Sequence, residues 1–131
     1  MAFQCIVVTP DHQVLDESIT QAIVPAHDGK VGILTDRAPI LMKLGIGEMR
    51  LDLPSGQKQS FYVEGGVAQM KDNKLTILTQ EATPADKIDA SAARAELSAA
   101  QERKPTDPAG VEQRNKALAR ARARVEMTQK T

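Results

Sequence analysis

The residues best suited to chemistry are the arginines near the end of this sequence. The segment KALARARARVEM sets Arg120, Arg122 and Arg124 two residues apart among alanines. Alternation of this kind is typical of a strand, but alanine is the strongest helix former and is depleted in strands. We therefore predict a helix, in which a spacing of four residues, rather than two, brings side chains onto one face.

In that helix the basic residues divide between two positions. One face carries Lys116, Arg120 and Arg124, while Arg114 and Arg122 fall beside the apolar seam. The opposite side collects small and apolar side chains, namely Ala117, Leu118, Ala121 and Val125. The sequence thus predicts a helix with a basic outer face and a narrow seam of small residues.

The net charge of zero conceals an uneven distribution. Residues 1–83 hold seven Lys and Arg against ten Asp and Glu, whereas residues 111–131 hold six against two. A basic tail on an otherwise acidic protein suggests an acidic partner, which is a protein, a nucleotide or a membrane surface. Two other interpretations stay open: the halves attract each other, or the basic face is solvated surface. The tail lacks interleaved aromatics and the pI is near neutral, which argues against nucleic acid.

No arrangement of side chains in the sequence predicts an enzyme or a metal site. His12 and His27 lie in turn-like stretches without a neighbouring Cys or an Asp/Glu-x-x-His pattern. Cys5 lies in a β-rich run and is predicted to be a small core residue rather than a nucleophile. The glycines of GGVAQMKDNK lead into a hairpin and do not form a strand-to-helix phosphate loop. We expect a non-catalytic chain without a metal.

Composition predicts one domain, or one domain with an appendage, in a chain of 131 residues. The sequence has no Trp, two Phe and one Tyr, so the core must be aliphatic. The single cysteine excludes an internal disulfide and fits a reducing compartment. The first residues lack the basic start and long apolar run of a signal peptide, and no apolar stretch has the length of a membrane span.

The first 82 residues predict an antiparallel β-sandwich or flattened barrel. Turn signals such as LPSGQ, AHDGK, VEGGV and KDNK recur closely, and no helical period lies between them. Alternation puts Leu75 and Ile77 on one face of KLTILT, and Phe61 and Val63 on one face of SFYVE. Many short strands of this kind are typical of sandwiches and barrels. The predicted strands are FQCIVV, QAIVPA, KVGIL, ILMKL, GEMRLDL, SFYVE, VAQM and KLTILT.

The composition changes at EATPADKID, and the remainder predicts two helices. Thr83, Pro84 and Asp86 have the form of a helix start, with a cap, a proline at the first helical position and an acidic first turn. The prolines and glycine of Lys104–Gly110 end the first helix, and a second begins near Val111. We therefore predict a sandwich domain over residues 1–83 and an antiparallel two-helix hairpin over residues 84–131.

A seam made of alanine predicts weak docking of that hairpin. On the first helix the apolar stripe is formed by Ile88, Ala92, Ala95 and Ala99. Burying an alanine methyl contributes about 0.8 kcal/mol, against about 1.5–3 kcal/mol for a Leu or Ile side chain. We expect the hairpin to be attached marginally to the sandwich and to be able to detach.

The order of these motifs resembles the epsilon subunit of bacterial F-type ATP synthases. The most specific stretch contains Val8-Thr9-Pro10, Gly29-x-x-Gly32-Ile33-Leu34 and Ala38-Pro39, with Gly65-Gly66 and the Asp72-Asn73 turn downstream. The motifs IDASAARAEL and ALARARARV follow, so the resemblance covers nearly the whole chain. It implies the same fold: an N-terminal sandwich and a C-terminal helical hairpin.

The resemblance also implies a non-catalytic central-stalk subunit, which binds the gamma subunit and the membrane ring of c subunits and couples ion flow to ATP synthesis. Its hairpin can leave the sandwich and extend along gamma toward the alpha and beta subunits, where it restrains ATP hydrolysis. The residues implied in that contact are Arg114, Lys116, Arg120, Arg122 and Arg124. Those implied in contact with the rotor ring are Asp28, Gly29, Lys30 and Gly32.

Some members of this family bind ATP on the folded hairpin, through an Ile/Leu-Asp-x-x-Arg-Ala motif and arginines of the second helix. Here Ala92 stands where the motif has arginine, and Arg94 points about 200° away around the helix. One lost charge-assisted contact with a phosphate costs about 1.5–3 kcal/mol, so ATP is expected to bind weakly or not at all. The positions that do match are Ile88, Asp89, Arg120 and Arg124.

The implied location is the cytoplasmic face of the bacterial plasma membrane, as a peripheral part of the ATP synthase complex that meets the membrane only through that complex. The residues taken alone leave an alternative from a different class of protein. It is a free-standing β-sandwich binding module, whose basic helical tail docks an acidic protein partner. Co-purification with gamma separates the two hypotheses.

Overall fold

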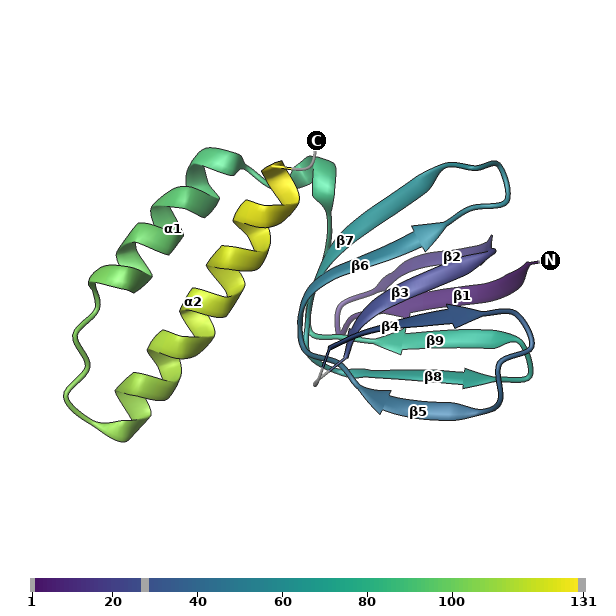
Figure 1. The fold of residues 1–131 in the computed structure, drawn as a ribbon, viewed down its shortest axis with the longest axis horizontal. Helices are drawn as coiled ribbons and strands as arrows, with labels where there is room; N and C mark the ends of the chain where they lie inside the picture. Colours follow the sequence, from purple (N-terminus) through teal and green to yellow (C-terminus); the bar gives the residue numbers. More distant parts are fainter. Residues whose placement is uncertain (1, 27–28, 130–131) are drawn as a thin grey trace.

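The computed structural model describes residues 2–26 and 29–129, which form a two-sheet sandwich followed by two helices (Figure 1). The predicted fold class is therefore confirmed. One sheet has the order β2 (Gln13–Ile19), β1 (Phe3–Val8), β9 (Lys74–Leu78), β8 (Val67–Lys71) and β5 (Ile40–Lys43). The other has the order β10 (Ala82–Pro84), β7 (Lys58–Glu64), β6 (Ile46–Asp52), β3 (Gln21–Ala26) and β4 (Gly29–Leu34).

Among the described residues, neighbouring strands pair antiparallel with one exception. β1 and β9 run parallel, with Cys5 opposite Leu75 and Val7 opposite Ile77. Parallel neighbours need a long connection, and here the intervening strands of both sheets provide it. The predicted antiparallel architecture thus holds for the remaining strand pairs of the described residues.

Two strands were not predicted from the sequence. β2 is mostly exposed and carries Asp16 and Glu17, so it lacks the apolar alternation that marks a half-buried strand. β10 was interpreted as the start of a helix, and that prediction is wrong. Thr83 and Pro84 pair with Tyr62 and Phe61 at the edge of the second sheet. A proline is tolerated there because an edge strand has one side without ladder hydrogen bonds.

The core lies between the two sheets and is largely aliphatic, as the composition predicts. Leu75 and Ile77, and likewise Phe61 and Val63, belong to it, which confirms both predicted alternations. Cys5 is fully buried, and this burial raises the pKa of its thiol to about 12. The thiol is therefore protonated at neutral pH, and Cys5 is a core residue as predicted.

The helical part consists of a short 3₁₀ helix, η1 (Ala85–Lys87), and two α-helices, α1 (Ala90–Glu102) and α2 (Pro108–Gln129). α1 starts later than predicted, because its cap is Asp89, whose carboxylate accepts a 3.2 Å hydrogen bond from the Ala92 N–H. α2 starts earlier than the predicted Val111. Asp107 accepts a 2.8 Å hydrogen bond from the Gly110 N–H, and the proline after it occupies the first helical position.

The buried stripe of α1 lies one residue away from the predicted one. Ala93 and Ala100 are buried and Leu97 is half-buried, whereas the predicted Ala92, Ala95 and Ala99 are exposed. Alanine occurs on every side of this helix, so it does not mark a face, and Leu97 was the informative residue. On α2 the predicted seam is confirmed, with Leu118 and Ala121 buried and Ala117 and Val125 half-buried.

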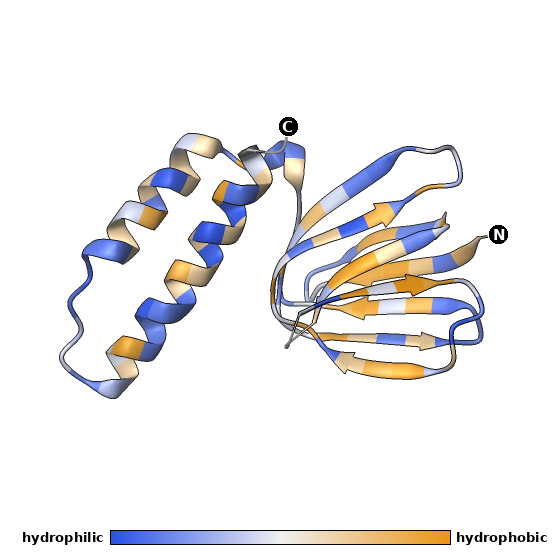
Figure 2. Ribbon diagram, viewed as in Figure 1, coloured by the Kyte–Doolittle hydropathy of each residue, from blue (hydrophilic) through white to orange (hydrophobic). Residues whose placement is uncertain are grey.

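Figure 2 shows apolar residues concentrated on the strands, while hydrophilic residues cover much of both helices. Within the described residues, neither helix is long and apolar enough to cross a membrane.

Two adjacent glycines allow a test of the turn between β7 and β8. Gly65 and Gly66 both have positive φ, of 71° and 103°. A Cβ at Gly66 would collide with the carbonyl oxygen of Leu78, whereas a Cβ at Gly65 would meet nothing within 4 Å. Gly65→Ala should cost about 1–2 kcal/mol of unfolding free energy through its backbone conformation alone. Gly66→Ala should cost about 1–3 kcal/mol more, because the carbonyl of β9 has to move. Equal urea midpoints for the two variants would contradict this account.

Candidate functional site

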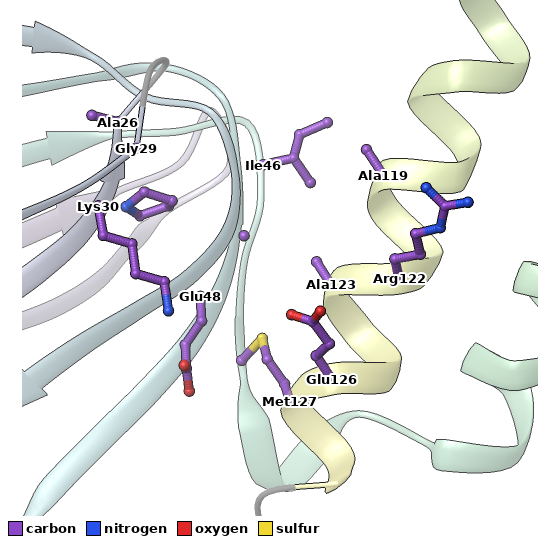
Figure 3. Close-up of a pocket in the computed structure, with 12 residues that line it drawn as sticks. Ala26, Gly29, Lys30, Ile46, Glu48, Ala119, Arg122, Ala123, Glu126 and Met127 are labelled. Carbon is purple, nitrogen blue, oxygen red and sulfur yellow. The ribbon is translucent and has the colours of Figure 1, made fainter.

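The helix α2 attaches the hairpin to the sandwich. It packs against β6 and β7 on one side and against α1 on another. Figure 3 shows Ala119, Ala123 and Met127 on the side of α2 that faces the sandwich, across from Ile46 of β6. Met127 is buried, and it is the one large apolar side chain among these three helix residues. The apolar part of the attachment is therefore small.

The polar part of the attachment includes Arg120. Its Nε lies 2.7 Å from Oε1 of Glu64, the last residue of β7. The same oxygen accepts a 2.9 Å hydrogen bond from the hydroxyl of Tyr62. The buried Nε of Arg120 is not aligned for a hydrogen bond. Arg120 and Glu64 are thus held by charge, while Tyr62 positions the carboxylate.

Arg124 joins three parts of the molecule. Its Nη1 donates to Oε2 of Glu96 on α1 at 2.8 Å, and its Nη2 donates to Oε2 of Glu81 at 3.1 Å. The guanidinium carbon also lies 4.6 Å from the centroid of the Tyr62 ring, which is a cation–π distance. Only 22% of the Arg124 side chain is exposed. One guanidinium therefore connects α2 with both α1 and the sandwich.

Burial and neighbouring charges determine the ionisation states of this cluster. Burial raises the pKa of Tyr62, and its hydrogen bond to Glu64 raises it further. Burial acts to lower the pKa of Arg124, but Tyr62, Glu81 and Glu96 outweigh this effect and the pKa is raised. At neutral pH Tyr62 is therefore a neutral hydrogen-bond donor and Arg124 is a cation.

A cavity of about 340 Å³ adjoins the two arginines, between α1, α2 and the sandwich. Its charged lining contains equal numbers of carboxylates and guanidinium groups. These are Glu64, Glu81, Glu96, Arg103, Arg120 and Arg124. Because the opposite charges balance, an anion that enters this cavity meets no net positive charge. It has to displace a carboxylate to reach Arg124.

The predicted outward direction of two arginines is wrong. Arg120 and Arg124 were expected on an outer face with Lys116, but they turn toward acidic groups of the sandwich and of α1. Lys116 is exposed. Helical spacing correctly puts these residues on one side of the helix, but it does not say which neighbouring element covers that side.

The remaining basic residues of α2 lie apart from this cluster. Arg114 donates from Nε to the Arg103 carbonyl at 3.1 Å and from Nη2 to the Gln101 carbonyl at 3.3 Å. It thereby caps the last turn of α1, whose final carbonyls lack helical partners. Arg122 is exposed on another side of α2, beside a cavity of about 320 Å³ against the sandwich. Arg114 and Arg122 are therefore not brought together with Arg120 and Arg124, and Lys116 does not line the cavity beside those two arginines.

The other predicted site residues occupy two further places. Ile88 and Asp89 lie at the start of α1, where Asp89 caps the helix, and neither lines the cavity beside the arginines. Gly29, Lys30 and Gly32 belong to β4, and Gly29 and Lys30 line the cavity on the Arg122 side of α2. Asp28 lies outside the described residues. Across the described chain, no group of three His, Cys, Asp or Glu side chains is arranged to hold a metal ion.

The acidic half of the cluster was missed from the sequence. Glu64, Glu81 and Glu96 lie in three different segments, so no local spacing relates them. The available signal was Tyr62, because alternation with Phe61 and Val63 places it on the outer face of its strand. A large aromatic residue there indicates that another element covers that face, and Tyr62 is indeed fully buried.

Comparison with known proteins identifies the family of this fold. Residues 2–85 match the family described as ATP synthase, Delta/Epsilon chain, beta-sandwich domain. The ATP synthase epsilon chain of Rhodopirellula baltica is 34% identical over 95% of this chain and 97% of its own length. That of Rippkaea orientalis is 38% identical over 96% of each chain. The chain belongs to the ATP synthase epsilon-chain family. The family named from the sequence motifs is thus confirmed, and it is a family of non-catalytic subunits.

Two solved structures share the fold of this epsilon-family chain. A chain in the cryo-EM structure of Euglena gracilis mitochondrial ATP synthase, OSCP/F1/c-ring in rotational state 1, matches with a TM-score of 0.87 and 22% identity. That match covers 93% of this chain and 78% of the other. A chain of the Tetrahymena thermophila mitochondrial ATP synthase central stalk and c-ring matches with a TM-score of 0.73 and 15% identity over 95% of both. The likeness includes the helices as well as the sandwich.

The capping role of Arg114 in this epsilon-family chain is testable. Arg114→Gln should fray the last turn of α1, because two carbonyls lose a charged donor. Amide exchange over residues 99–103 should accelerate about three- to tenfold, the equivalent of about 0.5–1.5 kcal/mol for a hydrogen bond. Lys116→Gln removes the same charge from the same helix without removing a cap, and it should leave this exchange unchanged. Identical exchange in both variants would rule out the capping role.

Proposed function

We propose that this chain is the epsilon subunit of an ATP synthase central stalk, where it couples ion flow to ATP synthesis and restrains ATP hydrolysis through its C-terminal helices. Its partners are the gamma subunit, the c-subunit ring and, through the extended helices, the alpha and beta subunits. Its place is the cytoplasmic face of the bacterial plasma membrane, as a peripheral part of the complex.

One observation carries this proposal. The matches to the proteins of Rhodopirellula baltica and Rippkaea orientalis, at 34% and 38% identity, cover 95% and 96% of this chain, so they include both the sandwich and the hairpin, and both proteins are named ATP synthase epsilon chain. The similar folds come from ATP synthase assemblies that include the c-ring. A free-standing binding module has no reason to keep both parts of this subunit in one order.

The way the hairpin is attached supports a regulatory role. α2 faces the sandwich with alanines and one large apolar residue, and cavities of about 320 and 340 Å³ lie on either side of the contact. Alanine burial contributes little, and exposed ion pairs contribute about 0–1 kcal/mol each. The sandwich, by contrast, has a continuous core of its own. The hairpin can therefore detach while the sandwich stays folded.

In the extended state the basic residues of α2 would contact the catalytic subunits. Arg120 and Arg124 contribute to this contact after leaving their carboxylate partners, and Arg114, Lys116 and Arg122 supplement them. The loop and strand around Gly29, Lys30 and Gly32 would face the rotor ring, together with Asp28. The region from Glu64 to Lys74 would lie near gamma.

The hairpin's role is tested by measuring ATP hydrolysis. The cognate catalytic complex, stripped of this subunit, is reconstituted with the full chain or with residues 1–88. The shorter piece keeps β10 and η1, and the core cluster comes wholly from residues 3–77, so it retains its core. Both should bind gamma, and only the full chain should suppress hydrolysis. Equal suppression by both would remove the hairpin from the mechanism, and failure of both to bind gamma would favour the free-standing module.

ATP binding is tested by calorimetry on the isolated chain. We expect weak binding or none, because Arg124 is already paired and Ala92 supplies no charge. Ala92→Arg restores the motif and should tighten binding about ten- to a hundredfold, the worth of one charge-assisted contact. Ala95→Arg, also on an exposed position of α1, adds the same charge outside the motif and serves as the control. A micromolar dissociation constant for the unmodified chain contradicts this expectation.

A further inference from the structure

The two arginines that the proposed function assigns to a partner already have partners within the chain. Glu64 ends β7, Glu81 lies between β9 and β10, and Glu96 lies on α1. All three meet α2 within 2.7–3.1 Å of a guanidinium nitrogen. The carboxylates of Glu64 and Glu81 belong to the sandwich part of the chain, whereas Glu96 moves with the hairpin.

We infer that Glu64 and Glu81 form an internal acidic site that holds Arg120 and Arg124 while the hairpin is docked, and that docking thereby withholds both arginines from other anions. The inference rests on the proposed function for the identity of the competing partner, which is an acidic surface of the catalytic subunits. The docking contact itself belongs to the isolated chain.

The geometry of Arg124 makes its two uses mutually exclusive. Both Nη atoms donate to carboxylates, and the guanidinium lies over the Tyr62 ring. A partner's carboxylate that forms a bidentate pair with the two Nη atoms of Arg124 needs the same donors. Such a partner therefore has to replace Glu81 or Glu96, and the hairpin has to leave the sandwich for Glu81 to be replaced.

The balance of charges in the cavity also indicates that docking keeps the arginines from other anions. In the docked state the cavity beside the arginines contains as many carboxylates as guanidinium groups. When the hairpin leaves, Glu64 and Glu81 stay behind on the sandwich, so Arg120 loses its carboxylate partner and Arg124 loses one of its two. Glu96 keeps its contact with Arg124 as long as α1 and α2 remain together. The docked hairpin therefore pairs its arginines with the chain's own carboxylates, whereas the undocked hairpin offers them to an acidic partner.

Docking is measured on the full isolated chain, as the distance between spin labels at Ser55→Cys on the β6–β7 turn and Ser98→Cys on α1. Both positions are exposed, and the native Cys5 is buried and unreactive. Glu64→Gln/Glu81→Gln should raise the ratio of undocked to docked chains about tenfold, which corresponds to about 1.4 kcal/mol for two partly exposed pairs. Glu102→Gln/Glu112→Gln removes the same charge from exposed helix positions and should leave the distances unchanged.

Salt provides an independent measurement of the same contact. Raising the ionic strength from about 0.05 to about 0.5 M should undock the unmodified chain, because partly exposed pairs are screened. It should affect the Glu64→Gln/Glu81→Gln variant much less, because the screened pairs are already gone. Distances that respond neither to salt nor to the carboxylate variant would overturn the inference. If the carboxylate variant does not fold, the test is repeated with Arg120→Gln/Arg124→Gln. Arg94→Gln, which changes an exposed arginine of α1, is the control.

Suppression of ATP hydrolysis in the reconstituted complex tests whether docking keeps the two arginines from the catalytic subunits or only holds the hairpin on the sandwich. Glu64→Gln/Glu81→Gln releases both arginines from the sandwich without removing them, so it should suppress ATP hydrolysis several-fold more strongly than the unmodified chain. Arg120→Gln/Arg124→Gln also releases the hairpin, but it should suppress hydrolysis less than the carboxylate variant, because the arginines that would contact the catalytic subunits are gone. If the carboxylate variant undocks without stronger suppression, the inference fails and the proposed function stands. If the unmodified chain neither binds gamma nor suppresses hydrolysis, the proposed function fails, while the salt and distance results still decide the internal contact.

Discussion

The hairpin is positioned on the sandwich largely by ion pairs, and one guanidinium pairs with both the sandwich and α1. Arg124 reaches Glu81 of the sandwich and Glu96 of α1, and it stacks on Tyr62 of β7. These contacts are partly buried, so salt screens them less than it screens surface ion pairs, but it still weakens them. They orient the hairpin more than they stabilise it, because partly exposed ion pairs contribute only about 0–1 kcal/mol each.

The two parts of the chain are stabilised in different ways. The sandwich closes over aliphatic side chains, and its two sheets share one core from Phe3 to Ile77. The hairpin is held together by small residues such as Ala93, Ala100 and Ala121, with Leu118 as the larger contact. A rigid part and a weakly attached part on one chain suit a subunit that keeps one interface while it changes another.

The same cluster is the reason why we expect ATP to bind weakly or not at all. The second-helix arginines are present, but the chain's own carboxylates occupy them, and Ala92 lacks the charge that the related motif supplies. Asp89, which also belongs to that motif, serves as the cap of α1.

The sequence by itself determined the sandwich, the hairpin, the core faces of β7 and β9, and the seam of α2. These follow from turn residues, from alternation and from helical spacing, which are local properties. It failed where the signal was not local: β2 is stabilised by pairing with β1 rather than by its own pattern, and an alanine-rich helix such as α1 does not mark its buried face. Only the tertiary structure decided that Arg120 and Arg124 turn inward. Their partners lie up to 56 residues away along the chain, and no spacing within α2 encodes which acidic groups the fold brings beside it.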